Sequence, residues 1–235
     1  PETSLKEILL ISIFLRLFVI FVNPVTTDDH FRYLWDGKVQ SEGINPYKFS
    51  PLELTEVQDD VIYPKVSFPE IRTIYPPVSQ IIFFLSNKFF GEQVIGLKFF
   101  YLLFEIGILC FLYNSMKLLK INSNYIFLYA LSPLIIFEFF INAHIDIVIL
   151  FFLAGSIYFA LKMNMNLSML FLGFSVLSKV YSIIFLPLFI IYFYKKNRNL
   201  KSLSVSLLYF LISFLIIIFY SDGILNIFLT MNNYM

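Results

Sequence analysis

The sequence predicts an all-α polytopic membrane protein. Hydrophobic residues make up 59% of the 235 positions and include 30 phenylalanines, more than a soluble core of this length needs. The apolar residues gather in segments long enough, or nearly long enough, to cross a bilayer. Three of the connections between them carry lysine or arginine and no acid, which is typical of cytoplasmic loops.

Seven segments are predicted to cross the membrane, and several of them are short. They are residues 5–22, 93–116, 124–141, 146–161, 167–181, 183–194 and 202–220. The first is too long, and too apolar at both ends, for a cleaved signal peptide, so we interpret it as a retained anchor. Residues 74–90 are an eighth candidate, but prolines and polar residues leave only 81–85 uninterrupted. We expect this segment to lie in the membrane interface.

The loop charges predict an orientation. If residues 74–90 do not cross and the N-terminus is cytoplasmic, the basic connections all face the cytoplasm. These connections are residues 117–123, 162–166 and 195–201. The same model places 24–92, 138–146, 179–182 and 221–235 on the outer face. A model with the N-terminus outside and 74–90 crossing also satisfies the rule. It separates Asp28 and Asp29 from the other unusual polar groups by a membrane, so we prefer the first model.

The connection at residues 24–92 is too long for a simple loop. Residues 28–42 are predicted to form a helix there, which Thr27 or Asp28 caps and Gly43 ends. One face of this helix carries Asp29, Arg32, Tyr33 and Asp36. An amphipathic helix that rests on the membrane with Trp35 among the headgroups would also explain the spacing. It would not explain two acids at the exit of the first span.

Ionisable residues near predicted outer turns need a reason, because such residues at membrane depth are costly and usually functional. They are Glu138, His144, Asp146 and Lys179. Lys179 could instead extend to the headgroups, and His144 could merely cap a turn. Together with Asp28 and Asp29, the group predicts a cavity at the outer leaflet. In it a carboxylate would act as general base while the cation and the histidine hold a phosphate.

Several kinds of site are disfavoured. The net charge of +1 argues against a nucleic-acid partner. Cys110 is the single cysteine, which excludes a disulfide within the chain and argues against a cysteine metal cluster. Asp28, Asp29 and Asp146 could offer oxygen ligands to a divalent metal, but they form no committed metal motif. We therefore expect no metal and no other cofactor.

Three stretches resemble a known group of membrane enzymes. "DDHFRYLWDGKVQSEGINPY" at residues 28–47, followed by "IYPP" at 74–77, resembles the first outer loop of GT-C superfamily glycosyltransferases. The likeness is to the bacterial and archaeal polyprenyl-phosphate-mannose-dependent group, with the pattern D-D-x-x-R-Y-x-W-D-G, then G-x-N-P-Y, then Y-P-P. "INAHIDI" at 141–147 resembles the second outer-loop motif of that group. "LSKVYSIIFLP" at 177–187 resembles its lysine-containing turn before the sixth helix.

The resemblance implies one GT-C-like seven-helix transmembrane module over residues 1–235, with amphipathic interfacial helices in the first outer loop at 24–92. It implies a multi-pass cell-membrane hexosyltransferase. The enzyme would move a sugar, mannose in this group, from a polyprenyl-phosphate donor to a hydroxyl of a glycan or glycolipid, with inversion at the outer face. Family members usually continue with further helices, so we expect a C-terminally truncated fragment or a minimal member. The sequence leaves the donor sugar, the acceptor and the linkage open.

The same resemblance assigns residue roles. Asp29 would be the catalytic base, with Asp28 as the second candidate. The residues expected to bind substrate or the donor phosphate are Arg32, Tyr33, Tyr75, Glu138, His144, Asp146 and Lys179. Arg32 would either orient Asp29 or contact the phosphate. Ala143 and Ile145 depart from the pattern, because they stand where the group has glycine and asparagine.

Two other functions remain open at this point. A lipid-sugar flippase or a small-solute transporter would also place acids and a lysine in a membrane cavity. Such carriers more often show internal repeats, with helices broken by glycine and proline in matching halves. The sequence has no such repeat, and its long polar first loop is unusual for a carrier. A catalytically inactive assembly subunit is favoured only by the length of the chain.

Overall fold

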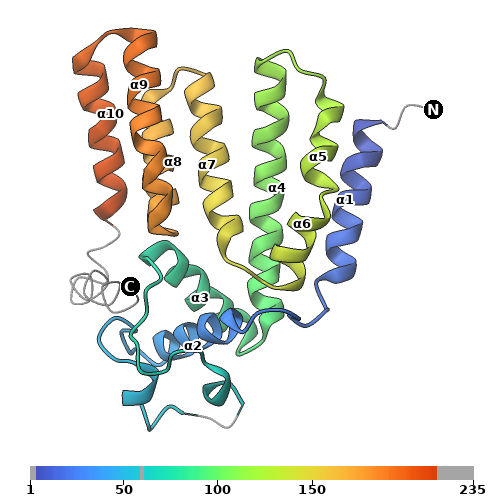
Figure 1. The fold of residues 1–235 in the computed structure, drawn as a ribbon, viewed down its shortest axis with the longest axis vertical. Helices are drawn as coiled ribbons and strands as arrows, with labels where there is room; N and C mark the ends of the chain where they lie inside the picture. Colours follow the sequence, from blue (N-terminus) through green and yellow to red (C-terminus); the bar gives the residue numbers. More distant parts are fainter. Residues whose placement is uncertain (1–3, 59–60, 216–235) are drawn as a thin grey trace.

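Every regular element that the computed structural model describes, over residues 4–58 and 61–215, is helical. Upright helices form a bundle, and α2 (Asp29–Ser41) and α3 (Pro77–Phe90) lie across one of its ends (Figure 1). The prediction of an all-α protein is therefore confirmed for the described residues.

One described helix has the length and hydropathy expected of a membrane span. It is α4 (Val94–Leu118), with 25 residues and a mean hydropathy of 2.1. A second span is counted only if the bent pair of helical segments at Ser123–Ala130 and Pro133–Ile141 is taken as one. The predicted module of seven transmembrane helices therefore stays a prediction.

The apolar stretch predicted at 124–141 is a series of short helical segments with a bend, and not one straight helix. Its pieces are η3 (Ser123–Ile126), α5 (Phe127–Ala130), α6 (Pro133–Ile135) and the π-helical turn η4 (Ile136–Ile141). The two halves meet at 47°. Pro133 explains the break, because its ring clashes with the preceding turn and it has no N–H to donate. The π-turn carries Glu138, and such turns are frequent at functional sites.

Helices of the bundle run alternately up and down. The remaining upright helices are α1 (Leu5–Val19), α7 (Asp146–Leu161), α8 (Met165–Val176), α9 (Leu186–Asn197) and α10 (Leu200–Ser213). Figure 1 shows the lysine-rich connections after α4, α7 and α9 at the end away from α2 and α3. The connections before α7 and after α8 lie beside α2 and α3. Polar residues of separate connections therefore meet at one end.

Some helix ends differ from the prediction. The helix over 146–161 has its predicted bounds, but the one predicted over 167–181 stops at Val176. Lys179 is extended, with φ −160°, before the 3-10 turn η5 (Val180–Phe185). Lys179 is thus held in a break between two helices.

The crosswise pair is packed into the protein and does not rest bare on a membrane. Trp35 of α2 is 1% exposed and lies beside Tyr63, with ring centroids 5.6 Å apart. The alternative that places Trp35 among headgroups is therefore wrong. Gly37 lets α2 approach α3, because any Cβ there would overlap the carbonyl oxygen of Phe83. Gly43 ends the helix with φ +79°, as predicted.

A buried ion pair and its hydrogen bonds join the upright helices α1, α4 and α5. Arg16 of α1 and Glu105 of α4 are paired with both side chains fully buried. Tyr129 of α5 donates a hydrogen bond of 2.8 Å to Glu105, and Arg16 donates one of 2.7 Å to the carbonyl of Ala130. The pair therefore fixes how α1, α4 and α5 pack.

We expect Glu105→Ala to lower the free energy of unfolding by about 3–5 kcal/mol, because it strands the Arg16 guanidinium in the interior. The double change Arg16→Met with Glu105→Leu removes both charges and should restore most of this loss. Denaturation of the purified protein in detergent measures both. A single variant as stable as the wild type would show that the pair is solvated.

Candidate functional site

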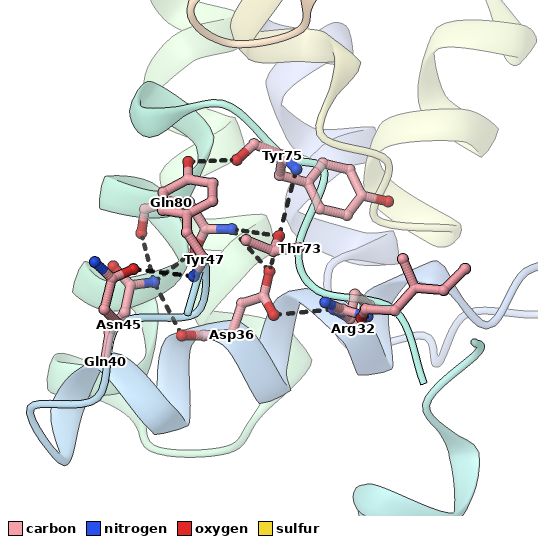
Figure 2. Close-up of polar contacts among 9 residues, drawn as sticks. Arg32, Asp36, Gln40, Asn45, Tyr47, Thr73, Tyr75 and Gln80 are labelled. Atoms are coloured by element: carbon pink, nitrogen blue, oxygen red, sulfur yellow. Dashed lines mark hydrogen bonds and ion pairs between the residues drawn. The ribbon is translucent and has the colours of Figure 1, made fainter. Parts of the chain in front are cut away.

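Asp36 is the centre of a buried network that joins α2 to α3 (Figure 2). One of its oxygens accepts a hydrogen bond of 2.9 Å from Nε of Arg32. The other accepts from the hydroxyl of Thr73 and, at 2.7 Å, from Nε2 of Gln80. Gln40 donates a hydrogen bond of 2.7 Å to Oε1 of Gln80. The segment before α3 is thereby fixed against α2.

A second set of contacts shapes the turn that precedes α3. The hydroxyl of Tyr47 donates a hydrogen bond of 2.6 Å to the carbonyl of Tyr75 (Figure 2). Asn45 supports Tyr47 by accepting its backbone N–H at 2.9 Å. Tyr33 stacks on Phe83, with centroids 4.7 Å apart, and meets the Tyr75 ring edge-on at 5.1 Å. These motif residues therefore build the platform on which the site rests.

A cleft of about 260 Å³, which we call the Asp29 cleft, opens above this platform. It is lined by Asp29, Arg32, Ser67, Phe68, Arg72, Ile74, Tyr75 and Lys179. Four of the predicted site residues, Asp29, Arg32, Tyr75 and Lys179, thus line one cavity. Burial raises the pKa of Tyr75 well above its ordinary value, so Tyr75 is a neutral phenol at neutral pH.

A carboxylate–imidazole–carboxylate series approaches the Asp29 cleft. Nδ1 of His144 lies 2.7 Å from Oε2 of Glu138, within hydrogen-bond distance. Nε2 of the same ring lies 3.9 Å from Oδ2 of Asp29, which is a charge contact and too long for a direct hydrogen bond. Glu138 therefore orients the ring so that its second nitrogen faces Asp29.

Lys179 is held at the cleft by an acid and by α3. Its Nζ lies 3.1 Å from both carboxylate oxygens of Asp146, the first residue of α7. Tyr181 donates a hydrogen bond of 2.7 Å to Asp146. The hydroxyl of Ser79 on α3 donates one of 2.7 Å to the carbonyl of Ser178, which directly precedes the lysine. The position of Lys179 thus depends on three elements.

The guanidinium of Arg32 is already hydrogen-bonded within the protein, so it is not free to bind a phosphate. Its Nε donates to Asp36, and its Nη1 donates a hydrogen bond of 2.9 Å to the carbonyl of Ile71. The next residue, Arg72, has only a distant charge contact of 4.0 Å with Glu53, and both side chains are partly exposed. Sequence reasoning missed Arg72; its nearness to the Y-P-P motif was the available signal.

Asp28 and Tyr33 are not brought to the Asp29 cleft. Asp28 lines a separate cleft of about 590 Å³, which we call the Asp28 cleft, on another side of α2. Tyr33 is 1% exposed within the core. His30 also lines the Asp28 cleft, and burial lowers its pKa, so its imidazole is neutral at neutral pH.

Asn142 is a further residue whose function the sequence did not reveal. Its Oδ1 accepts the backbone N–H groups of Val25 and Thr26, both at 3.3 Å. Its Nδ2 donates a hydrogen bond of 2.7 Å to the hydroxyl of Thr26. Asn142 therefore fixes the segment that leads into α2, and with it the start of the helix that carries Asp29.

The next residue explains one departure from the resembling motif. Ala143 has φ +60°, in the left-handed region that favours glycine, and it is fully buried. Glycine is expected at this position because the turn needs that backbone conformation. The departure therefore places a Cβ in a backbone conformation that favours glycine, which strains the turn.

The nitrogen and oxygen groups of the site have no arrangement typical of a metal centre. Over residues 4–58 and 61–215, no group of three or more His, Cys, Asp or Glu side chains is placed to hold a metal ion. Asp28 and Asp29 face different clefts, and Asp146 is occupied by Lys179 and Tyr181.

Comparison with known proteins gives one family. The model of the alpha-(1->6)-mannopyranosyltransferase N-terminal domain, MptA_B family, matches residues 3–195. Searches of curated proteins and of solved structures found no match. The matched range contains every residue that lines the Asp29 cleft.

We expect Ala143→Gly to leave the free energy of unfolding nearly unchanged. Relief of about 1–2 kcal/mol of left-handed strain offsets the lost methyl packing and the greater freedom of the unfolded chain. The matched control is Ala160→Gly within α7, which should cost about 1–2 kcal/mol because no strain is relieved there. Chemical denaturation in detergent compares them. Equal losses at both positions would contradict the strain at Ala143.

Proposed function

The chain belongs to the MptA_B family of alpha-(1->6)-mannopyranosyltransferases, and we propose that it transfers mannose from a polyprenyl-phosphate donor to an acceptor hydroxyl, with inversion, at the outer face of the membrane. Membership makes it a glycosyltransferase of the mannosyltransferase type, which acts between a sugar donor and a glycan acceptor. It also favours an enzyme over a flippase, a transporter or an inactive subunit. The lipid-linked donor, the stereochemistry and the topology are the proposed part.

One observation carries the proposal: a carboxylate and two cations share the Asp29 cleft. Asp29 is half-exposed, so it is free to contact a ligand. Lys179 and Arg72 line the same cavity and can hold the two charged oxygens of a phosphodiester. A base beside a phosphate site is the arrangement that transfer from a sugar phosphate needs.

The reaction would be a single displacement. Asp29 takes the proton of the acceptor hydroxyl as its oxygen bonds to the anomeric carbon of mannose. The bond between that carbon and the phosphate oxygen breaks, and polyprenyl phosphate leaves with the electron pair. Lys179 stabilises the negative charge on the departing phosphate. One displacement inverts the anomeric centre.

The surrounding residues would then support these two groups. Glu138 orients the ring of His144, whose Nε2 faces Asp29. This nitrogen can stabilise the negative charge of Asp29 or contact the sugar. Asp146 positions Lys179. Arg32 is better suited to orienting the loop than to binding phosphate, because two hydrogen bonds already occupy its guanidinium.

The proposed orientation in the membrane follows from the different residues at the two ends of the bundle. The basic connections lie at one end and would be cytoplasmic, whereas α2, α3 and the Asp29 cleft lie at the other (Figure 1). The crosswise helices would then sit at the outer interface. A long-chain lipid donor could keep its tail in the bilayer and present its head group to the cleft.

We expect Asp29→Asn to lower turnover by about two to four orders of magnitude, because the amide cannot accept the acceptor proton. The assay follows label from radiolabelled polyprenyl-phosphate mannose into product, with the full natural protein in membranes. Glu42→Gln is the control, since Glu42 is an exposed acid at the far end of α2. Near-normal turnover by Asp29→Asn would sink the assignment of the base, and absence of transfer by the wild type would sink the donor.

A further inference from the structure

Two adjacent acids serve two different clefts. Asp28 lines the larger cleft together with Phe31 and Leu34, which follow it at intervals of three residues along α2. Asp29 lines the smaller cleft together with Arg32, again three residues further on. Consecutive residues at a helix start point about 100° apart, whereas residues three apart share a face. The first turn of α2 is therefore a wall between two cavities.

The two cavities differ in chemistry. The Asp29 cleft holds Arg72 and Lys179 beside one acid, which suits a phosphate, and the guanidinium of Arg32 in its lining is already bonded to Asp36 and to the carbonyl of Ile71. The Asp28 cleft instead presents two acids, Asp28 and Glu92. Its lining also includes the amides of Asn23 and Gln93, the rings of Phe21 and Phe31, one lysine and several aliphatic side chains. Carboxylates and amides bind hydroxyl groups well, and exposed rings offer an apolar surface to a sugar.

The lining of the Asp28 cleft holds one lysine beside its two acids, so its carboxylates outnumber its cations. Nζ of Lys65 lies over the Phe31 ring, 5.0 Å from its centroid. Glu92 is paired with Lys38 at 3.1 Å, but Asp28 makes no capping hydrogen bond. A negatively charged ligand would therefore meet the Asp28 carboxylate, whereas an uncharged, hydroxylated one would donate to it.

His30 gives an independent sign of a ligand. It lines the Asp28 cleft and is 6% exposed, and its buried Nδ1 has no well-formed hydrogen bond, although the backbone of Thr27 lies close enough to raise the pKa of the ring. Buried polar atoms are normally paired, so an unpaired one beside a cavity indicates a partner that the chain itself does not supply. A ligand hydroxyl could pair with this nitrogen.

We propose that the Asp28 cleft binds the acceptor, an uncharged glycan, and that Asp28 is an acceptor-binding residue and not a second catalytic base. This inference rests on the proposed function. Donor and acceptor then approach the start of α2 from different sides. Because Asp28 and Asp29 are both exposed at the start of α2, the reacting hydroxyl extends around this first turn to Asp29, while the phosphate stays among the cations of the smaller cleft.

The test separates acceptor binding from catalysis. The full natural protein is assayed in detergent with polyprenyl-phosphate mannose and an α-(1→6)-linked mannose disaccharide, the linkage of the family description. Asp28→Asn should raise the KM for the disaccharide about 10-fold, as expected for one lost hydrogen bond to a charged group. The kcat at saturating disaccharide and the KM for the donor should stay within about 2-fold. Glu42→Gln should change none of them.

A second variant probes the cleft away from the acid. His30→Phe keeps the ring packing but removes the unpaired nitrogen, and it should raise the same KM with unchanged donor KM. Binding without turnover is measured by saturation-transfer NMR of the disaccharide on Asp29→Asn, and it should weaken when Asp28→Asn is added.

Three results would overturn the inference. They are a fall in kcat alone for Asp28→Asn, a changed inhibition constant for polyprenyl phosphate, or an unchanged disaccharide KM in both variants. Each result is compared with the same measurement on a wild-type protein that transfers mannose. A wild type that transfers none contradicts the proposed function itself, and the NMR comparison then decides on the cleft alone.

Discussion

The buried carboxylate of Asp36 is the constraint on which the end of the bundle at α2 and α3 depends. It accepts hydrogen bonds from α2, from the segment at Thr73 and from α3, so one charge fixes three pieces of chain. Because Arg32 supplies the compensating charge, the carboxylate is buried without an unpaired charge. The Asp29 cleft lies directly on these pieces, and its shape therefore follows from a residue that does not line it.

Charged groups near the proposed base are held in place before any ligand arrives. Lys179 is fixed by Asp146, and the His144 ring is fixed by Glu138. Fixed charges stabilise a developing negative charge better than mobile ones, because they do not have to reorganise during the reaction. The ion pairs also limit the net positive charge of the cleft. A cleft of this kind favours a phosphate that leaves after transfer over one that stays bound.

Local signals in the sequence predicted the elements that local physics decides. The helix over 28–42 and the helix over 146–161 follow from apolar spacing, and the first of them ends at Gly43 as expected for a glycine. Of the two predicted caps, Asp28 makes no capping hydrogen bond, whereas the hydroxyl of Thr27 accepts one of 3.2 Å from the N–H of Asp29. The contact between Arg32 and Asp36 and the divergence of Asp28 from Asp29 are both encoded in the spacing along one helix. The bond from Arg32 to the carbonyl of Ile71 and the clefts that the two acids line depend on packing against other segments, which that spacing does not encode. Trp35 was open to a surface interpretation for the same reason: only the fold shows what covers it.

The bond between Ser79 and the carbonyl of Ser178 spans 99 residues of chain. During synthesis at roughly 5–20 residues per second, the α2–α3 platform therefore emerges about 5–20 s before the segment that delivers Lys179. Through that interval the nascent loop has the proposed base Asp29 but lacks one of the cations of the Asp29 cleft. Under the proposed mechanism, competence for chemistry arrives only with the turn after α8, and chains released before this turn would be inert.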